Sequence, residues 1–97
     1  MTEDSVIVNL PKKLDEFLAK SERILGCAIG DKNGLTMALK GEIDQDDVAV
    51  GVNALQEINK NVQESKTLYL YDYKESNCLH CSYIDESLFL VQLVAAN

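Results

Sequence analysis

Basic residues are scarce in this chain of 97 residues. Nine Lys and Arg residues stand against sixteen Asp and Glu, the net charge is −7, and Arg23 is the only arginine. A protein that binds nucleic acid needs clustered positive charge to follow the phosphate backbone, and an anionic membrane attracts the same kind of basic cluster. The composition therefore argues against nucleic acid and against an anionic membrane as partners.

Long apolar runs are also absent. No segment approaches the length that crosses a bilayer, so we expect no direct membrane insertion. The first ten residues, MTEDSVIVNL, carry two acids and lack the positive and apolar regions of a secretory signal. We expect a cytoplasmic location.

Cysteine occurs three times, an odd number that fits reduced thiols better than a disulfide framework. Cys78, His80 and Cys81 form the group with the most suitable ligand types for zinc. On a strand, however, Cys78 and His80 point to one face and Cys81 to the other, so the three cannot converge on one ion. A nucleophile pair of Cys78 and His80 would lack an orienting group and an oxyanion hole. We therefore expect no metal, no cofactor, no catalytic residue and no enzyme activity.

Two further patterns resemble ligand sites only in part. The glycines Gly26, Gly30 and Gly34 are not followed by the Lys-Ser/Thr pair that opens a helix after a phosphate loop. The acidic residues between Glu42 and Asp47 lack the spacing of an EF-hand. Helix capping explains these carboxylates better than cation binding does.

The clearest structural signal is the segment 24–40, ILGCAIGDKNGLTMALK, which predicts two strands joined by a tight turn. Asn33 and Gly34 both tolerate the positive φ that such a turn requires. Large and small side chains alternate on the first strand, so we expect one face to lie under a helix and the other to be approached closely. The large residues are Leu25, Cys27 and Ile29, and the small ones are Gly26, Ala28 and Gly30.

The segment before this hairpin predicts a short amphipathic helix from Leu10 to near Arg23 that lies on the sheet. Its apolar stripe consists of Leu10, Leu14, Phe17 and Leu18. The run Val6–Val8 in front of it fits a hydrophobic staple, an added edge strand or a contact for a partner, and the sequence leaves these three alternatives open.

A longer helix is predicted from Asp44 to Val62. Asp44 is its N-cap and Asp47 is the acid of a capping box. The helix carries two apolar stripes, although covering one sheet needs only one of them. The first stripe consists of Val48, Val52, Leu55 and Val62; the second consists of Gly51, Ala54 and Ile58, and Val50 widens the apolar surface. We expect the second stripe to be available to another surface, with Gly51 and Ala54 allowing close approach.

Three further strands follow. Residues 67–73 place leucines on one face and Tyr69, Tyr71 and Tyr73 on the other, either as cross-strand packing or as an exposed recognition surface. Residues 78–84 form the next strand. The nearly all-apolar run 88–94 is predicted to be a central strand that is covered on both faces.

The order of these elements resembles the Roadblock family, also called the dynein light chain Roadblock or MglB-like family, which includes the small Ragulator subunits. The resemblance is carried by ILGCAIGDKNGLTMALKG, the Asp-rich helix start, the helix 44–62, and the acidic turn IDES before LFLVQLV. It implies an α/β (α+β) fold, a two-layer Roadblock/longin-like domain whose five-stranded antiparallel sheet has the element order α-β-β-α-β-β-β. We expect one domain over residues 1–97, with a core at 10–94 and an N-terminal extension at 1–9.

The resemblance further implies a non-catalytic dimerising scaffold that binds a small Ras-like GTPase or a GTPase-regulating complex. The alternative it implies is a dynein light chain-like adaptor that clamps an intermediate-chain segment. In either case the resemblance implies that recruitment to an endomembrane or a motor complex is through partners. Proteins of this family form homodimers or heterodimers in which the third strands pair and the long helices pack side by side. Carried onto this chain, the expected dimer interface consists of Val50, Gly51, Ala54, Ile58, Leu68, Tyr69, Leu70, Tyr71 and Tyr73.

Overall fold

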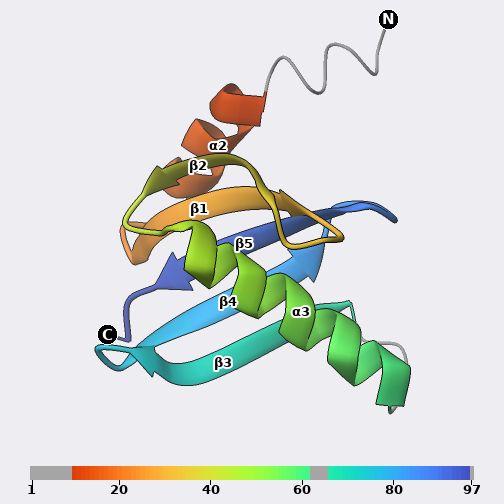
Figure 1. The fold of residues 1–97 in the computed structure, drawn as a ribbon. Helices are drawn as coiled ribbons and strands as arrows, with labels where there is room; N and C mark the ends of the chain where they lie inside the picture. The colour runs from red at the N-terminus through yellow and green to blue at the C-terminus, as the bar shows by residue number, and fades with distance from the viewer. Residues whose placement is uncertain (1–9, 62–65, 97) are drawn as a thin grey trace, which may run out of the picture.

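The computed structural model describes residues 10–61 and 66–96 (Figure 1). Its elements are α2 (Leu10–Ala19), β1 (Ile24–Asp31), β2 (Thr36–Gly41), α3 (Gln45–Asn61), β3 (Thr67–Lys74), β4 (Asn77–Tyr83) and β5 (Leu88–Val94). The strands form one antiparallel sheet in the order β2-β1-β5-β4-β3. The predicted fold class and element order are confirmed, and β5 is the central strand that its apolar sequence indicates. Val6–Val8 and Val62 lie outside the described residues.

The two helices lie on opposite faces of this sheet. Figure 1 shows α3 running diagonally across one face, which we call the α3 side. On the other face, the α2 side, Leu14 of α2 is fully buried against Cys27 and Ile29 of β1. Within the described residues α2 contacts only β1 and β2. No described helix therefore covers the α2 side of β3, β4 and β5. The prediction that the strand 88–94 is covered on both faces is wrong in this respect, because only its α3 side lies under a described helix.

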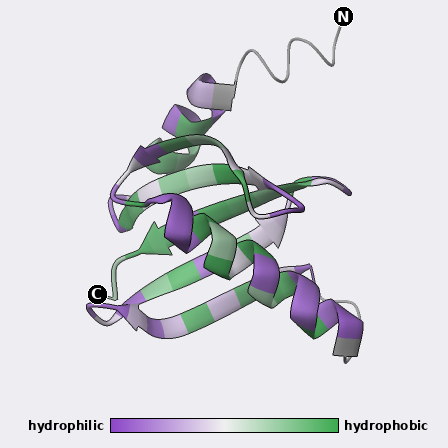
Figure 2. Ribbon diagram, viewed as in Figure 1, coloured by the Kyte–Doolittle hydropathy of each residue, from purple (hydrophilic) through white to green (hydrophobic). Residues whose placement is uncertain are grey.

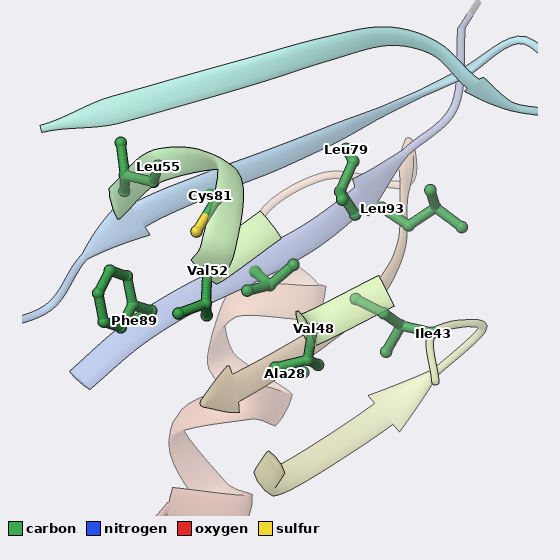
Figure 3. Packing of buried hydrophobic residues seen from close by; sticks show 10 residues of the cluster. Ala28, Ile43, Val48, Val52, Leu55, Leu79, Cys81, Phe89 and Leu93 are labelled. Carbon is green, nitrogen blue, oxygen red and sulfur yellow. The ribbon is translucent and has the colours of Figure 1, made fainter. Parts of the chain in front are cut away.

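The larger core lies between α3 and the sheet. Figure 2 shows β1 and β5 as mostly hydrophobic, which agrees with their central positions. In Figure 3, Val48, Val52 and Leu55 project from α3 toward the sheet, and Val48 lies beside Ala28 of β1. These three residues are the described members of the first apolar stripe predicted for the helix, and all are fully buried. Burial of such aliphatic side chains stabilises a fold by about 1.5–3 kcal/mol each relative to exposure.

The capping box at the start of α3 is also confirmed. The amide of Asp47 donates to Oδ1 of Asp44 over 3.0 Å, and the amide of Asp44 donates to Oδ2 of Asp47 over 3.1 Å. The first helix is shorter than predicted, because α2 ends at Ala19 and not near Arg23. A tight turn replaces its last part, in which the amide of Lys20 bonds to the carbonyl of Phe17.

The turn between β1 and β2 differs from the predicted two-residue turn. Only Gly34 has a positive φ, of 84°, and Asn33 does not. The carboxylate of Asp31 accepts hydrogen bonds from the amides of Asn33 at 2.9 Å and Leu35 at 3.0 Å. Because this carboxylate organises a loop longer than two residues, a single residue with positive φ is sufficient to reverse the chain.

The small face of β1 is approached closely, as predicted. A Cβ on Gly30 would lie 2.6 Å from Cγ1 of Val48, so the glycine lets α3 sit close to the strand. The prediction that the three large residues of this strand share one face is wrong for one of them. Leu25 packs on the α3 side, whereas Cys27 and Ile29 pack under α2. A shift in the pairing of β1 with β5, between Ile24 and Gly26, breaks the simple alternation.

Candidate interaction surface

The third strand lies at an edge of the sheet. Among the described elements β3 pairs only with β4, so its outer side presents unpaired backbone groups. Leu68 and Leu70 pack against the core on the α3 side. Tyr69 and Tyr71 are on the other face and are 53% and 76% exposed. The predicted aliphatic and aromatic faces are therefore confirmed for this part of the strand.

Tyr73 is an exception, because its side chain lies on the leucine face. The pairing of β3 with β4 shifts between Leu70 and Lys74, and Asp72 within this bulge has a φ of 53°. The bulge turns the strand so that Tyr73 packs against the α3-side core. Its hydroxyl donates a hydrogen bond of 2.6 Å to Oδ1 of Asp47. Tyr73 therefore belongs to the protein's own packing and not to an aromatic outer face.

Asp47 is a buried carboxylate at the junction of α3 and β3, with 1% of its surface exposed. Besides Tyr73, it accepts hydrogen bonds from Nζ of Lys74 at 3.1 and 3.2 Å and from the amide of Asp44. Burial acts to raise the pKa of Asp47, but the hydrogen bonds from Tyr73, Asp44 and Lys74 outweigh it and the pKa is lowered. Burial and the Asp47 carboxylate together raise the pKa of Tyr73. The ionised carboxylate thus fastens the start of α3 to the end of β3.

One flank of α3 faces the side on which β3 lies. Ala54 and Ile58 follow Asp47 by seven and eleven residues, which is about two and three turns of a helix, so the three lie nearly in line. Ala54 and Ile58 are half-buried, and Val50, one turn before Ala54, is 40% exposed. With the leucines of the neighbouring strand they form a surface that we call the α3–β3 seam. The seam consists of Val50, Ala54, Ile58, Leu68 and Leu70.

Gly51 was predicted to lie on this partner-facing stripe, and the structure contradicts that placement. Gly51 is buried against its own sheet. A Cβ at this position would lie 3.2 Å from Cγ1 of Val91 and 3.3 Å from Cβ of Cys81. The missing side chain therefore serves the close packing of α3 on β4 and β5, and it does not serve the approach of a second chain.

The structure thus separates the nine residues that were predicted as a dimer interface. Val50, Ala54 and Ile58 lie on the flank of α3 that faces β3, and Leu68 and Leu70 lie on the α3 side of that strand. Gly51 and Tyr73 are used inside the fold, and Tyr69 and Tyr71 lie on the opposite face of the sheet. The interface itself stays a prediction.

A series of polar side chains in contact with one another on the α2 side was not predicted from the sequence. Gln92 of β5 is 7% exposed; its Nε2 lies 3.6 Å from Sγ of Cys27 and its Oε1 lies 3.0 Å from Nδ1 of His80. The His80 ring stacks on Tyr69, with centroids 4.6 Å apart and planes 7° apart. The sequence feature that could have pointed to these contacts is Gln92 itself, because a single polar residue inside an apolar strand needs a hydrogen-bond partner.

The cysteines lie as the strand geometry predicted. Cys81 is buried under α3, whereas His80 lies on the other face beside Tyr69. Burial raises the pKa of all three thiols, and it raises the pKa of Cys81 to about 12. Such thiols are protonated at neutral pH and are poor nucleophiles. Within the described residues no group of three or more His, Cys, Asp or Glu side chains is placed to hold a metal ion. Over the same residues, neither helix has the length and apolar character to cross a membrane.

No family model and no curated protein matches the sequence. Solved structures do match the fold. A Roadblock/LC7 domain from Streptomyces avermitilis has a TM-score of 0.75 at 10% identity, over 89% of this chain and 78% of that one. Myxococcus xanthus MglB has a TM-score of 0.73 at 15% identity, over 93% of this chain and 72% of that one. An MglB structure with a tetrameric arrangement has a TM-score of 0.69 at 16% identity, over 87% of this chain and 68% of that one. The chain therefore has a Roadblock-like fold, as its sequence resemblance implies.

Proposed function

We propose that this protein is a non-catalytic scaffold that dimerises through the outer edge of β3 and the α3–β3 seam. The observation that carries the proposal is an unpaired edge strand beside a helix flank whose Val50 is exposed and whose Ala54 is small. A second strand satisfies the free backbone groups of such an edge, and a small side chain lets a second helix approach closely. The second chain is a copy of this protein or another chain with the same fold.

Antiparallel pairing of two β3 strands would join two five-stranded sheets into one. The two α3 helices would then lie on the same face and cover each other's seams. A domain of this size buries only about 60–65% of its unfolded surface, so an interface adds usefully to its stability. The proposal places the partner contact on surface that the fold itself leaves uncovered.

The proposed role of the dimer is to hold a small Ras-like GTPase or a GTPase-regulating complex. The support is the sequence resemblance to the Roadblock family together with the structural likeness to MglB and to a Roadblock/LC7 domain. The tetrameric arrangement is a feature of one of the MglB structures and is not part of the proposal for this chain.

A pull-down tests this role. The full chain is used as bait for small Ras-like GTPases loaded with GDP or with a non-hydrolysable GTP analogue, and for a dynein intermediate-chain segment. Retention of a GTPase with a preference for one nucleotide supports the proposal. Retention of the intermediate-chain segment alone contradicts it and favours a motor adaptor.

A further inference from the structure

A hollow of about 490 Å³ lies on the α2 side of the sheet, beyond the reach of α2. It spans the end of the sheet at which β1 and β4 begin and β5 ends. Its lining includes Arg23 before β1, His80 on β4, and Tyr69, Tyr71 and Asp72 on β3. The hollow is separate from the α3–β3 seam, which lies on the other face.

An aromatic wall forms the β3 end of this hollow. Tyr71 lies beside Tyr69, with ring centroids 6.2 Å apart and planes 21° apart. Tyr69 in turn is stacked on His80, and the buried Gln92 holds the His80 ring from below. Because Nε2 of Gln92 is directed at Cys27, its Oε1 is left to accept the proton on Nδ1 of His80. Tyr69 and His80 are therefore held in place by contacts within the protein, and Tyr71 lies at the exposed end of the wall.

The charges at the same end are negative. Asp72 lines the hollow, and its carboxylate has no hydrogen bond or ion pair with any described residue. The same is true of the Glu75 carboxylate in the next turn. Lys74, between them, is turned to the other face of the sheet, where it pairs with Asp47 and Asp44. No described cation therefore neutralises Asp72.

Arg23 belongs to the far end of the hollow. Its guanidinium donates a hydrogen bond of 2.8 Å to the carbonyl of Ala95. The strand that begins directly after it, β1, lies three positions from β3 in the sheet, a backbone separation of about 14 Å at the usual strand spacing. The hollow is thus polarised, with its positive charge away from the aromatic wall.

We propose that this hollow binds a cationic side chain, an arginine or a lysine of a partner protein, against the ring of Tyr71 and the carboxylate of Asp72. The face of an aromatic ring attracts cations, and Tyr71 is 76% exposed. The net charge of −7 also favours a partner with basic residues. The site goes beyond the proposed dimer. Backbone pairing at the edge of β3 would leave the tyrosine rings open, because side chains stand perpendicular to a sheet.

Nuclear magnetic resonance of the full chain tests the site with two short peptides, acetyl-Gly-Arg-Gly-amide and its neutral analogue with citrulline in place of arginine. We expect the arginine peptide to shift the amide signals of Tyr71, Asp72 and His80 saturably, with a dissociation constant in the range of about 1–10 mM. The citrulline peptide should bind about fivefold more weakly, because it has the same shape without the charge.

Three variants separate the contributions to binding. Tyr71→Leu should weaken binding about fivefold, while Tyr71→Phe keeps the ring and should keep the affinity. Asp72→Asn should weaken binding about threefold, and Asn tolerates the positive φ of 53° at this position. Glu86→Gln, which removes one acid from the turn before β5, is the matched control and should leave the affinity unchanged.

Equal binding of the two peptides, or equal binding to wild type and Tyr71→Leu, would overturn the proposal. The absence of a saturable shift would also overturn the proposal. This holds as well if the cause is that the chain's own ends or a second copy fill the hollow. Preferential binding of acetate near Arg23 would reassign the hollow to anions. The mass of Tyr71→Leu in solution should equal that of the wild type, so a failure of this site is distinguishable from a failure of dimerisation.

Discussion

The hydroxyl of Tyr73 and Oδ1 of Asp47 are joined by a hydrogen bond of 2.6 Å that connects the end of β3 to the start of α3. These two elements supply the proposed interface, and Lys74 of β3 donates two further hydrogen bonds to the same carboxylate. The bulge at Asp72 turns Tyr73 toward the helix. The relative position of the seam and the strand edge therefore depends on this junction.

Replacing Tyr73 by Phe should destabilise the protein by about 1–2 kcal/mol, because a buried carboxylate loses one of its donors. Urea unfolding at neutral pH measures the change. Tyr71→Phe is the control, since the Tyr71 side chain is mostly exposed and should tolerate loss of the hydroxyl. Equal free energies of unfolding for Tyr73→Phe and wild type would mean that the Tyr73–Asp47 hydrogen bond does not stabilise the fold.

The stability should depend on pH through Asp47. Its pKa is lowered in the folded state, so its contribution is complete above the unfolded pKa of about 3.9 and is lost as the pH falls through the lower folded value. We expect the difference in free energy of unfolding between wild type and Asp47→Asn to be larger near pH 7 than near pH 3. Urea unfolding across this range measures it. A difference that stays constant with pH would contradict the assigned charge of the buried carboxylate.

Gly51→Leu should destabilise the isolated chain by about 1–3 kcal/mol, because the new side chain meets Val91 and Cys81 of the same molecule. Thermal or urea unfolding at low protein concentration measures this effect. Ala54→Leu is the matched control one turn along on the open flank, and it should change monomer stability far less. If Gly51→Leu left stability unchanged and only altered association, the glycine would face a partner after all.

The parts of the fold that follow from local pattern could be predicted. The capping box at Asp44 and Asp47 needs only residues three apart, and the central position of β5 follows from its apolar sequence. Residue spacing also placed Cys81 on the face opposite to His80, because side chains alternate along a strand.

Other features depend on contacts between distant segments. A helical wheel shows two apolar stripes on α3, but only the packed sheet reveals that Gly51 faces inward. Tyr73 follows Tyr69 and Tyr71 in perfect alternation, and the bulge that reverses it lies in the pairing with β4. The Asp31 carboxylate, by bonding to the loop amides, removed the need for a second left-handed residue. None of these can be derived from periodicity alone.

The central claim is that the α3–β3 seam pairs two chains, and the mass in solution measured by light scattering tests it most directly. For the wild type we expect about twice the chain mass of 10.8 kDa over a range of concentrations. Ala54→Glu should give the monomer mass with an unchanged circular dichroism spectrum. Asn53→Glu, on the opposite flank beside Gly34, should remain dimeric. A folded wild-type monomer at every concentration would contradict homotypic pairing, and a dimer that survives Ala54→Glu would contradict the seam as its interface.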